Sequence, residues 1–361
     1  MIPYWILFLL PAMMALTSRP AGRIRRDGTR FTRFTGLWAL AFFGLTMMIG
    51  FRYFVGGDWG AYYVYLEDAL VLDFWSNMKR EDPGYRLINE FSLIMGWGIQ
   101  GVNTISGAIF AWGLIVFCRS LPRPWLALTV AIPYLVIVVS MGYTRQSIAI
   151  GLVMVGLVAL SRQKFVKFIF WVLLAALFHK SAVILLPIVA LTATRNRSLI
   201  VLLVAVTGAI GYQVVLADKA DRLITHYIQA GYQSGGALIR LGMNMVPAAL
   251  FLYYRKRIRL SHSEYRVWAL FSLLSLAMFA AFFVTSASTA LDRVALYMIP
   301  LQLFLFAHLP DLMGRYGKMN QGIVFMIVGY YASILMVWLT LGNFSRAWLP
   351  YRFAFSDLSG Y

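Results

Sequence analysis

The sequence is a succession of long apolar segments separated by short charged links. Across residues 125–161 the only charged side chain is Arg145. A helix needs about 20 mostly apolar residues to cross the hydrocarbon core of a bilayer, and fewer where it is kinked or buried in protein. Charged residues make up 13% of the chain, against about 25% in soluble domains. We therefore expect an all-α, polytopic integral membrane protein, because the chain has too little polar surface for a soluble globule.

Twelve mostly uncharged segments qualify as membrane spans, and their soft boundaries allow ten to fourteen. The predicted spans are residues 2–16, 36–53, 102–118, 125–142, 146–161, 165–179, 181–194, 198–216, 241–254, 267–285, 292–309 and 320–341. The first is interpreted as a retained span, since it lacks the basic start and cleavage site of a signal peptide. Residues 86–99 predict a surface or re-entrant helix. We expect one transmembrane domain over residues 1–361, with outer loops around 54–101 and 217–240.

The charges predict which links face the cytoplasm. Every second link is basic, and together these links hold 20 of the 32 Lys and Arg residues but only 3 of the 14 acidic ones. They are residues 17–35, 119–124, 162–167, 195–197, 255–266 and 310–319. Short cytoplasmic loops are enriched in Lys and Arg, so both termini are expected on the outer side. The net charge of +18 then sets topology and does not indicate nucleic-acid binding.

Ionisable side chains gather at the predicted outer ends of the spans. They are Asp58, Glu81, Arg145, His179, Arg240, Asp292 and Arg293. Such groups are costly at membrane depth and usually face a cavity. Several arginines beside two or three carboxylates suit an anionic substrate, such as a lipid pyrophosphate that carries a sugar.

The stretch "GGDWGAYY" opens the first outer loop. Asp58 is a candidate general base, or else an acid in a glycine turn beneath an aromatic belt. Trp59, Tyr62 and Tyr63 are candidate sugar-stacking rings, or interfacial anchors. Further along this loop, Pro83 and Gly84 form a turn, and Asp82 is expected to cap the helix that follows it. Glu81 is less easily explained by capping and is a second candidate base.

Arg145 lies in "TRQSIAIG", between two apolar segments. Its guanidinium either reaches the outer headgroups or, with Gln146 beside it, binds an anionic phosphate. Arg240 and Arg293 are further candidate phosphate ligands, although Arg293 can also be the neighbouring cation of a helix-start acid. His179 either packs at a hairpin tip, or orients or protonates phosphate. No spacing of His and Cys predicts a metal site, and no cofactor is implied.

The chain resembles the EpsG family of Wzy-like exopolysaccharide and O-antigen polymerases. The resemblance is carried by "GGDWGAYY", "EDPGYRLIN", "TRQSIAIG", "FHKSAVILLP", the Gly-Gly segment before Arg240, "LDRVALYMIP" and "WLPYRF", in that order. It implies a glycosyltransferase that joins oligosaccharide repeat units on undecaprenyl pyrophosphate at the outer face of a bacterial inner membrane. It also implies a likeness to C-type integral-membrane glycosyltransferases, which place an acidic residue where Asp58 stands.

The partners implied by the resemblance are the lipid-linked donor and acceptor and the membrane lipids. The sequence leaves open whether the protein works alone or beside a chain-length regulator and a flippase. Two other functions stay open. A flippase for the same lipid-linked units would favour midplane charges and internal repeats, neither of which is clear here. A ligase-type transferase would share the arginines and is harder to distinguish.

Overall fold

The computed structural model describes residues 1–21, 32–192, 198, 201–202, 205–206, 236–284 and 288–354. Within these ranges the chain is helical, with one isolated β-bridge between Arg52 and Phe353. The expected all-α class is confirmed. The helices are α1 Ile2–Thr17, α2 Gly36–Gly50, α3 Trp59–Val71, α4 Phe74–Met78, α5 Pro83–Ile94, α6 Gly98–Arg119, α7 Pro124–Ala131, η1 Ile132–Ser140, α8 Thr144–Ser161, α9 Phe165–Ala176, η2 Lys180–Leu185, α10 Leu186–Thr192, α13 Ala237–Tyr254, α14 His262–Ala281, α15 Ser288–Ala295, η5 Leu296–Met298, α16 Pro300–Met313, α17 Gln321–Leu341 and η6 Ser345–Ala347.

In the described part of the chain, six helices are long and apolar enough to cross a membrane. They are α6, α8, α13, α14, the continuous stretch Leu291–Met313 and α17. Four shorter apolar helices accompany them: α1, α2, the joined α7–η1 and α9. The protein is thus built as a multi-pass membrane protein, and a count of twelve spans stays a prediction. The predicted span 198–216 lies mostly outside the described residues.

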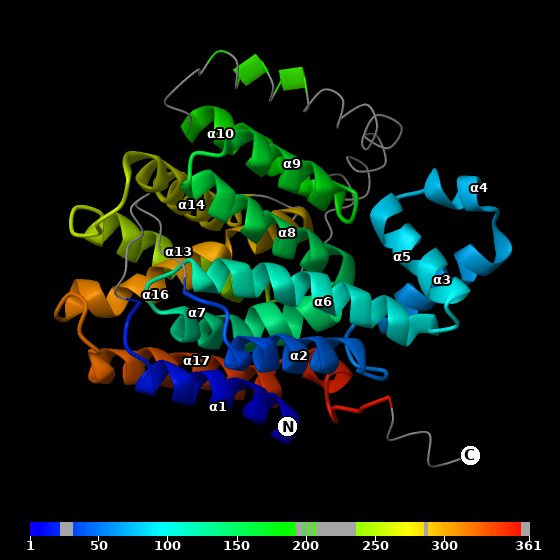
Figure 1. Cartoon of the computed structure of the whole chain (residues 1–361), viewed down its shortest axis with the longest axis horizontal. Helices are drawn as coiled ribbons and strands as arrows, with labels where there is room; N and C mark the ends of the chain where they lie inside the picture. Colours follow the sequence, from blue (N-terminus) through cyan, green and yellow to red (C-terminus); the bar gives the residue numbers. More distant parts are fainter. Residues whose placement is uncertain are drawn as a thin grey trace.

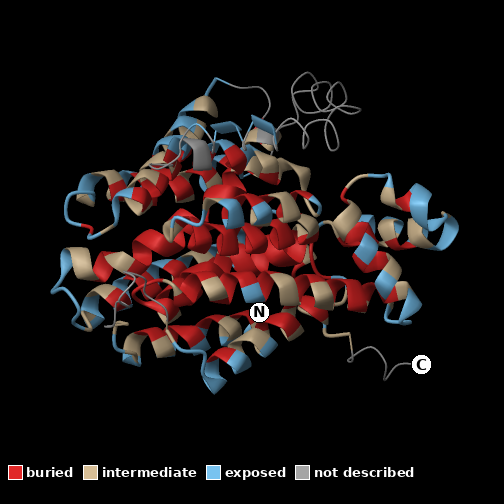
Figure 2. Cartoon of the chain, turned by 45° about the horizontal axis from the view of Figure 1, so that its top comes forward, coloured by how far each residue is buried: buried red, intermediate tan, exposed pale blue. Residues whose placement is uncertain are grey.

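Most of the long helices lie side by side, and α8 is at their centre (Figure 1). Helix α8 packs against α6 on one side and α9 on another. Nearly all of its side chains from Gln146 to Leu160 are buried, and the buried residues concentrate in this middle region (Figure 2). A helix that is apolar on every face needs neighbours all round, which explains its central place.

Close helix crossings depend on glycine. A Cβ atom at Gly113 of α6 would overlap the backbone carbonyl of Gly151 in α8, and one at Gly151 would lie 2.9 Å from the Phe110 Cα. At the crossing of α2 and α6, a Cβ at Gly107 would lie 2.9 Å from Ile49. Small residues let backbones approach in this way, because lipid supplies no hydrophobic drive for helix association.

The segment η1 is a π-helix that leads into α8. Its Ile137 carbonyl accepts a hydrogen bond of 2.8 Å from the Trp348 indole Nε1, and Trp348 is only 3% exposed. The Trp348 carbonyl in turn accepts a bond of 2.7 Å from the Tyr4 hydroxyl. The start of α1 and the segment after α17 therefore meet at the junction of η1 and α8.

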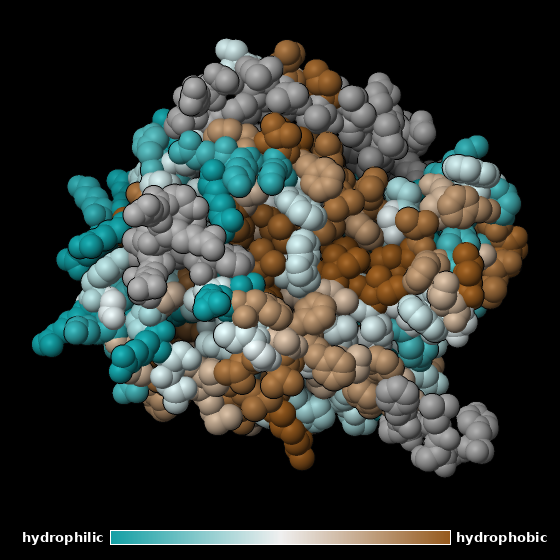
Figure 3. Space-filling model, viewed as in Figure 1, coloured by the Kyte–Doolittle hydropathy of each residue, from teal (hydrophilic) through white to brown (hydrophobic). Residues whose placement is uncertain are grey.

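Three of the links predicted to be cytoplasmic meet at the opposite end of the helices. Arg123 donates to Asp311 at 2.9 Å and to the Lys318 carbonyl at 2.7 Å, while Arg119 donates to the Thr32 carbonyl at 2.6 Å. Hydrophilic residues gather at one end of the molecule, and a more hydrophobic band lies beside them (Figure 3). Since α2 and α7–η1 begin at these links and end near Trp348, they connect the two ends.

Candidate functional site

Arg145 lies in the first turn of α8 and forms an ion pair with Asp82. The Arg145 side chain is 26% exposed and that of Asp82 is 5% exposed. The Arg145 guanidinium also lies 4.8 Å from the centre of the Tyr65 ring, while its buried Nε has no hydrogen-bond partner within the described residues. The expectation that Asp82 caps the next helix is wrong, because its side chain makes no capping hydrogen bond to α5.

A tight turn brings Asp82 to Arg145. Asp82 adopts a left-handed backbone with φ 56°, a conformation that Asp tolerates better than most residues. The following Gly84 donates its backbone N–H to the Leu177 carbonyl at 2.9 Å, and a Cβ there would lie 3.1 Å from that oxygen. The start of α5 is therefore held against the end of α9. The same contact lets Lys180 bind Glu81 at 3.0 Å.

Asp58 stands immediately before α3, at the end of the glycine loop. Gly56 has φ +111°, and a Cβ there would overlap the Met141 carbonyl oxygen just ahead of α8. The Gly56 N–H also donates to the Ala347 carbonyl at 2.8 Å. These contacts fix the loop beside the start of α8, so the position of Asp58 depends on Gly56, as "GGDWG" suggested. A substitution at Gly60 would meet nothing within 4 Å.

The Asp58 carboxylate makes no hydrogen bond or ion pair within the described residues, although it is partly buried. Burial raises the pKa of Asp58 above its ordinary value, and the nearby charges of Arg293 and then Arg145 oppose this shift. A carboxylate in this setting is a stronger base than an exposed one.

Arg293 lies close enough to Asp58 for its charge to act on that carboxylate. The Arg293 guanidinium stacks 4.6 Å from the Tyr143 ring centre and forms no ion pair within the described part of the chain. Gln146 donates to the Arg293 carbonyl at 2.6 Å, while its own buried Oε1 has no hydrogen-bond partner among the described residues. Gln146 therefore positions the backbone that carries Arg293.

Arg240 forms an ion pair with Asp292. Its Nε and Nη2 donate to the two carboxylate oxygens of Asp292 at 2.6 and 2.7 Å. This bidentate pair ties the start of α13 to α15, and Asn244 reinforces it with a bond of 2.8 Å to the Ala295 carbonyl. Binding of a phosphate by Arg240 would have to share or displace Asp292.

His179 lies just before η2, and its Nδ1 is 2.6 Å from the Ser181 hydroxyl. The Ser181 hydroxyl lies 3.2 Å from the Tyr297 hydroxyl. Burial, followed by the charges of Arg145, Arg293 and Lys180, lowers the pKa of His179 to about 3. His179 is therefore a neutral imidazole at neutral pH, which can orient a partner but carries no spare proton as an imidazolium.

The three aromatic residues predicted to stack on sugars have different environments. Trp59 is 5% exposed and Tyr62 is 4% exposed, so both rings pack inside the protein. Tyr62 lies 5.6 Å from the buried Tyr85 ring. Tyr63 is only half-buried and has a ring that a sugar can reach.

Sequence reasoning missed two buried arginines that support the site. Arg52 is 0% exposed and donates to Asn103 at 2.8 Å and to Thr144 at 2.9 Å, which joins α2, α6 and α8. Arg86 is 5% exposed, pairs with Asp68 at 3.1 Å, and lies 4.9 Å from the Tyr65 ring centre. Arg52 was not singled out from the sequence, because it falls within the predicted span 36–53. A charge inside a span is nevertheless itself an indication of burial.

Four separate segments of the chain thus bring a partly buried carboxylate, two guanidinium groups and a neutral imidazole to one end of a helical bundle. Neither a search of curated proteins nor a search of solved structures found a match to the chain. A family model does match, and it covers residues 36–353, from the start of α2 to the segment after Trp348. This range holds every residue of the candidate site, and the chain belongs to the EpsG family, a family of Wzy-like polymerases.

Proposed function

We propose that this protein is a polysaccharide polymerase that joins lipid-linked oligosaccharide repeat units, with Asp58 as the general base. The observation that carries the proposal is the Asp58 carboxylate, which is partly buried, has a raised pKa and makes no ion pair within the described residues. A structural acid would ordinarily be hydrogen-bonded when buried. Glu81 is the weaker candidate, because it is 41% exposed and bound to Lys180.

In the proposed step, the hydroxyl at the non-reducing end of the incoming unit attacks the anomeric carbon of the donor glycan. Asp58 takes the hydroxyl proton as the new glycosidic bond forms. The bond between the anomeric carbon and the pyrophosphate oxygen breaks, and undecaprenyl pyrophosphate leaves with the electron pair. The reaction would take place at the outer face of the bacterial inner membrane.

The arginines supply the charge that this leaving group requires. Arg145 has a vacant Nε, and Arg293 has no carboxylate partner in the described chain. Guanidinium groups held in place before the reaction stabilise charge that develops on a leaving oxygen. Asp82 positions Arg145, Gln146 positions Arg293, and the neutral His179 orients a phosphate oxygen or a sugar hydroxyl.

The test is the length of the glycan in cells that carry Asp58→Asn as the single copy. This change preserves the shape of the side chain and removes the base, so we expect the ladder of polymer lengths to collapse to single repeat units. The matched control is Asp73→Asn, at the start of α4, where Asp73 accepts a bond from the Ser76 N–H and Asn caps equally well. Immunoblotting verifies equal protein levels.

A full ladder with Asp58→Asn at normal protein levels would refute the assignment. The pattern of loss separates the rivals. Long polymer that stays on the lipid carrier would indicate a ligase-type transferase, since polymerisation would then survive. Lipid-linked units trapped on the cytoplasmic side would indicate a flippase.

A further inference from the structure

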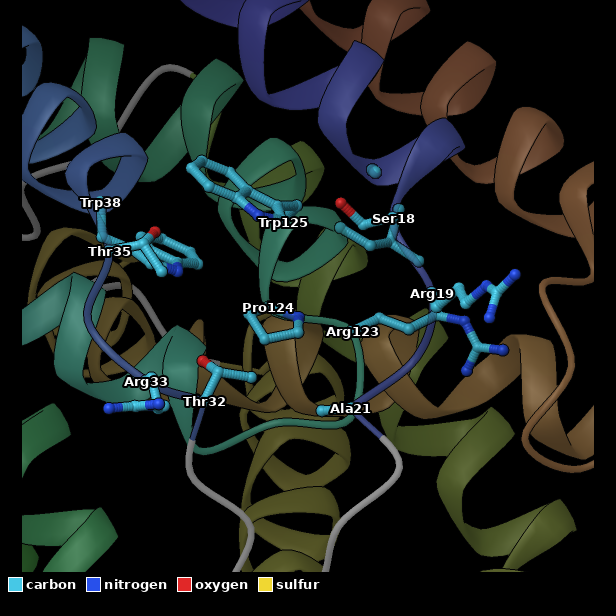
Figure 4. Close-up of a pocket in the computed structure, with 12 residues that line it drawn as sticks. Ser18, Arg19, Ala21, Thr32, Arg33, Thr35, Trp38, Arg123, Pro124 and Trp125 are labelled. Carbon is cyan, nitrogen blue, oxygen red and sulfur yellow. The ribbon is translucent and has the colours of Figure 1, made fainter.

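A cavity of about 280 Å³ lies at the end of the molecule opposite Asp58. It is lined by α1, α2, α7 and the links between them, namely Ala15, Ser18, Arg19, Ala21, Thr32, Arg33, Thr35, Trp38, Arg123, Pro124, Trp125 and Leu126. Figure 4 shows Arg19 and Arg123 side by side at one edge of the cavity, with Thr32 across from them. The proposed polymerase chemistry uses none of these residues.

The cavity has an excess of positive charge. Arg123 pairs with Asp311 at 2.9 Å, whereas Arg19 and Arg33 are exposed and form no ion pair within the described residues. Three arginines therefore line the cavity, and only Arg123 is paired with a carboxylate in the described chain. An excess of this kind favours an anionic ligand.

Two polar atoms of the cavity wall lack partners. Arg123 is 6% exposed, yet its Nη1 is buried and makes no hydrogen bond to the described residues. The Thr32 Oγ1 is also buried and has no partner in the described part of the chain. Buried polar atoms are nearly always hydrogen-bonded, so two orphaned atoms in one basic cavity point to an acceptor group that fills it, such as a phosphate.

Much of the remaining wall is apolar, and exposed apolar side chains lie near it. Trp38 and Trp125 stack with ring centres 4.0 Å apart, and on α2 the neighbouring Leu37 and Leu40 are 49% and 68% exposed. Tryptophan is enriched at headgroup depth, and basic pockets between helices on the cytoplasmic side bind anionic headgroups. A soluble phosphate has no apolar part that could contact these side chains.

We infer that this cavity binds the phosphate of an anionic phospholipid from the leaflet opposite the candidate catalytic site. Arg19, the Arg123 Nη1 and the Thr32 hydroxyl hold the phosphate, and the stacked tryptophans contact the glycerol and the first carbons of the acyl chains. The site is independent of the proposed polymerase reaction and would anchor the ends of α1, α2 and α7.

The test is native mass spectrometry of the purified full-length protein, delipidated in detergent and then given equal amounts of phosphatidylglycerol and phosphatidylcholine. We expect phosphatidylglycerol to be retained preferentially. Arg19→Gln should lower this retention about fivefold, near the effect of one arginine at a lipid surface. Thr32→Val, which preserves side-chain shape, should lower it as well. Arg255→Gln removes an exposed charge from another basic link and should leave retention unchanged.

Equal retention of the two lipids, or an equal loss in Arg19→Gln and Arg255→Gln, would overturn the inference. Displacement of the lipid by millimolar inorganic phosphate would assign the site to a free phosphate and overturn the lipid part of it. Arg19→Gln and Arg255→Gln change exposed groups, and Thr32→Val preserves the side-chain shape. Melting temperatures near that of the wild type verify that each variant is folded.

Discussion

At the scale of single residues, the ion pair of Arg145 and Asp82 connects the fold to the proposed chemistry. Asp82 gives Arg145 a fixed orientation and neutralises part of its charge inside the protein. The Arg145 Nε is buried and makes no hydrogen bond within the described residues. Asp82 is therefore expected to contribute mainly to stability, and Arg145 mainly to activity, so variants of the pair should be tested for both.

Asp82→Asn leaves the mostly buried guanidinium of Arg145 without its counter-charge. Breaking a buried pair is costly, and we expect the free energy of unfolding to fall by about 2 kcal/mol. The double variant Asp82→Asn/Arg145→Gln should lose less than the sum of the two single variants, because the members of a pair are coupled. Thermal melting in detergent measures this cycle. The control is Arg80→Gln, whose side chain is 48% exposed and whose removal should cost at most about 1 kcal/mol.

His179 predicts a dependence of stability on pH. Its pKa is about 3 in the folded protein and about 6.5 in an unfolded chain. Protonation therefore favours the unfolded chain, so this contribution is fully present above pH 6.5 and is lost as the pH falls toward 3. The slope from one such group reaches about 1.4 kcal/mol per pH unit. Melting temperatures between pH 4 and 8 should fall less steeply for His179→Gln, and parallel curves would contradict the assignment.

The sequence predicted where charged residues gather but not their pairing. Asp58, Arg145 and Arg293 follow from counting spans, because alternate links share one side of a membrane. The role of Asp82 did not follow, since the helix-start position is the same whether its side chain caps α5 or binds Arg145. That choice depends on the contact between Gly84 and Leu177, which lie far apart in the sequence.

At the scale of helices, the crossing of α6 and α8 determines where the site forms. Gly113→Ala places a methyl group against the Gly151 carbonyl, so the two helices must move apart. Overpacking of this kind costs about 1–3 kcal/mol, and the melting temperature should fall. The control is Gly44→Ala in α2, where a Cβ meets nothing within 4 Å and alanine improves helix propensity by up to about 1 kcal/mol. Similar melting for both variants would contradict this account of the crossing.

Hydropathy predicted these elements well, for a physical reason. A lipid-embedded helix must satisfy its backbone internally, so apolar length alone marks its position, and the predicted segment 146–161 differs from α8 by two residues at its start. The π-helix η1 was not predictable, because its register depends on a distant indole, Trp348, that binds the Ile137 carbonyl. The inward orientation of Trp59 and Tyr62 likewise depends on how α3 packs.

At the scale of the whole molecule, the two polar ends predict opposite accessibilities. The single cysteine, Cys118, is 0% exposed, so we expect the native chain not to react with thiol reagents. Arg346→Cys, near Trp348, should react with a membrane-impermeant maleimide in intact spheroplasts. Lys256→Cys should react only after permeabilisation. Both positions are exposed, so labelling of both from outside, or of neither, would contradict the predicted topology.

The meeting of the last segment of the described chain with the candidate site has a consequence for biosynthesis. Ala347 holds the Gly56 backbone, and Trp348 binds the π-helix that leads into α8. The ribosome makes these residues after it has made every described transmembrane helix. The loop that carries Asp58 therefore acquires its contacts with Ala347 and Trp348 only at the end of synthesis. A chain that ends before Ala347 would lack these contacts, and under the proposed function it would be inactive.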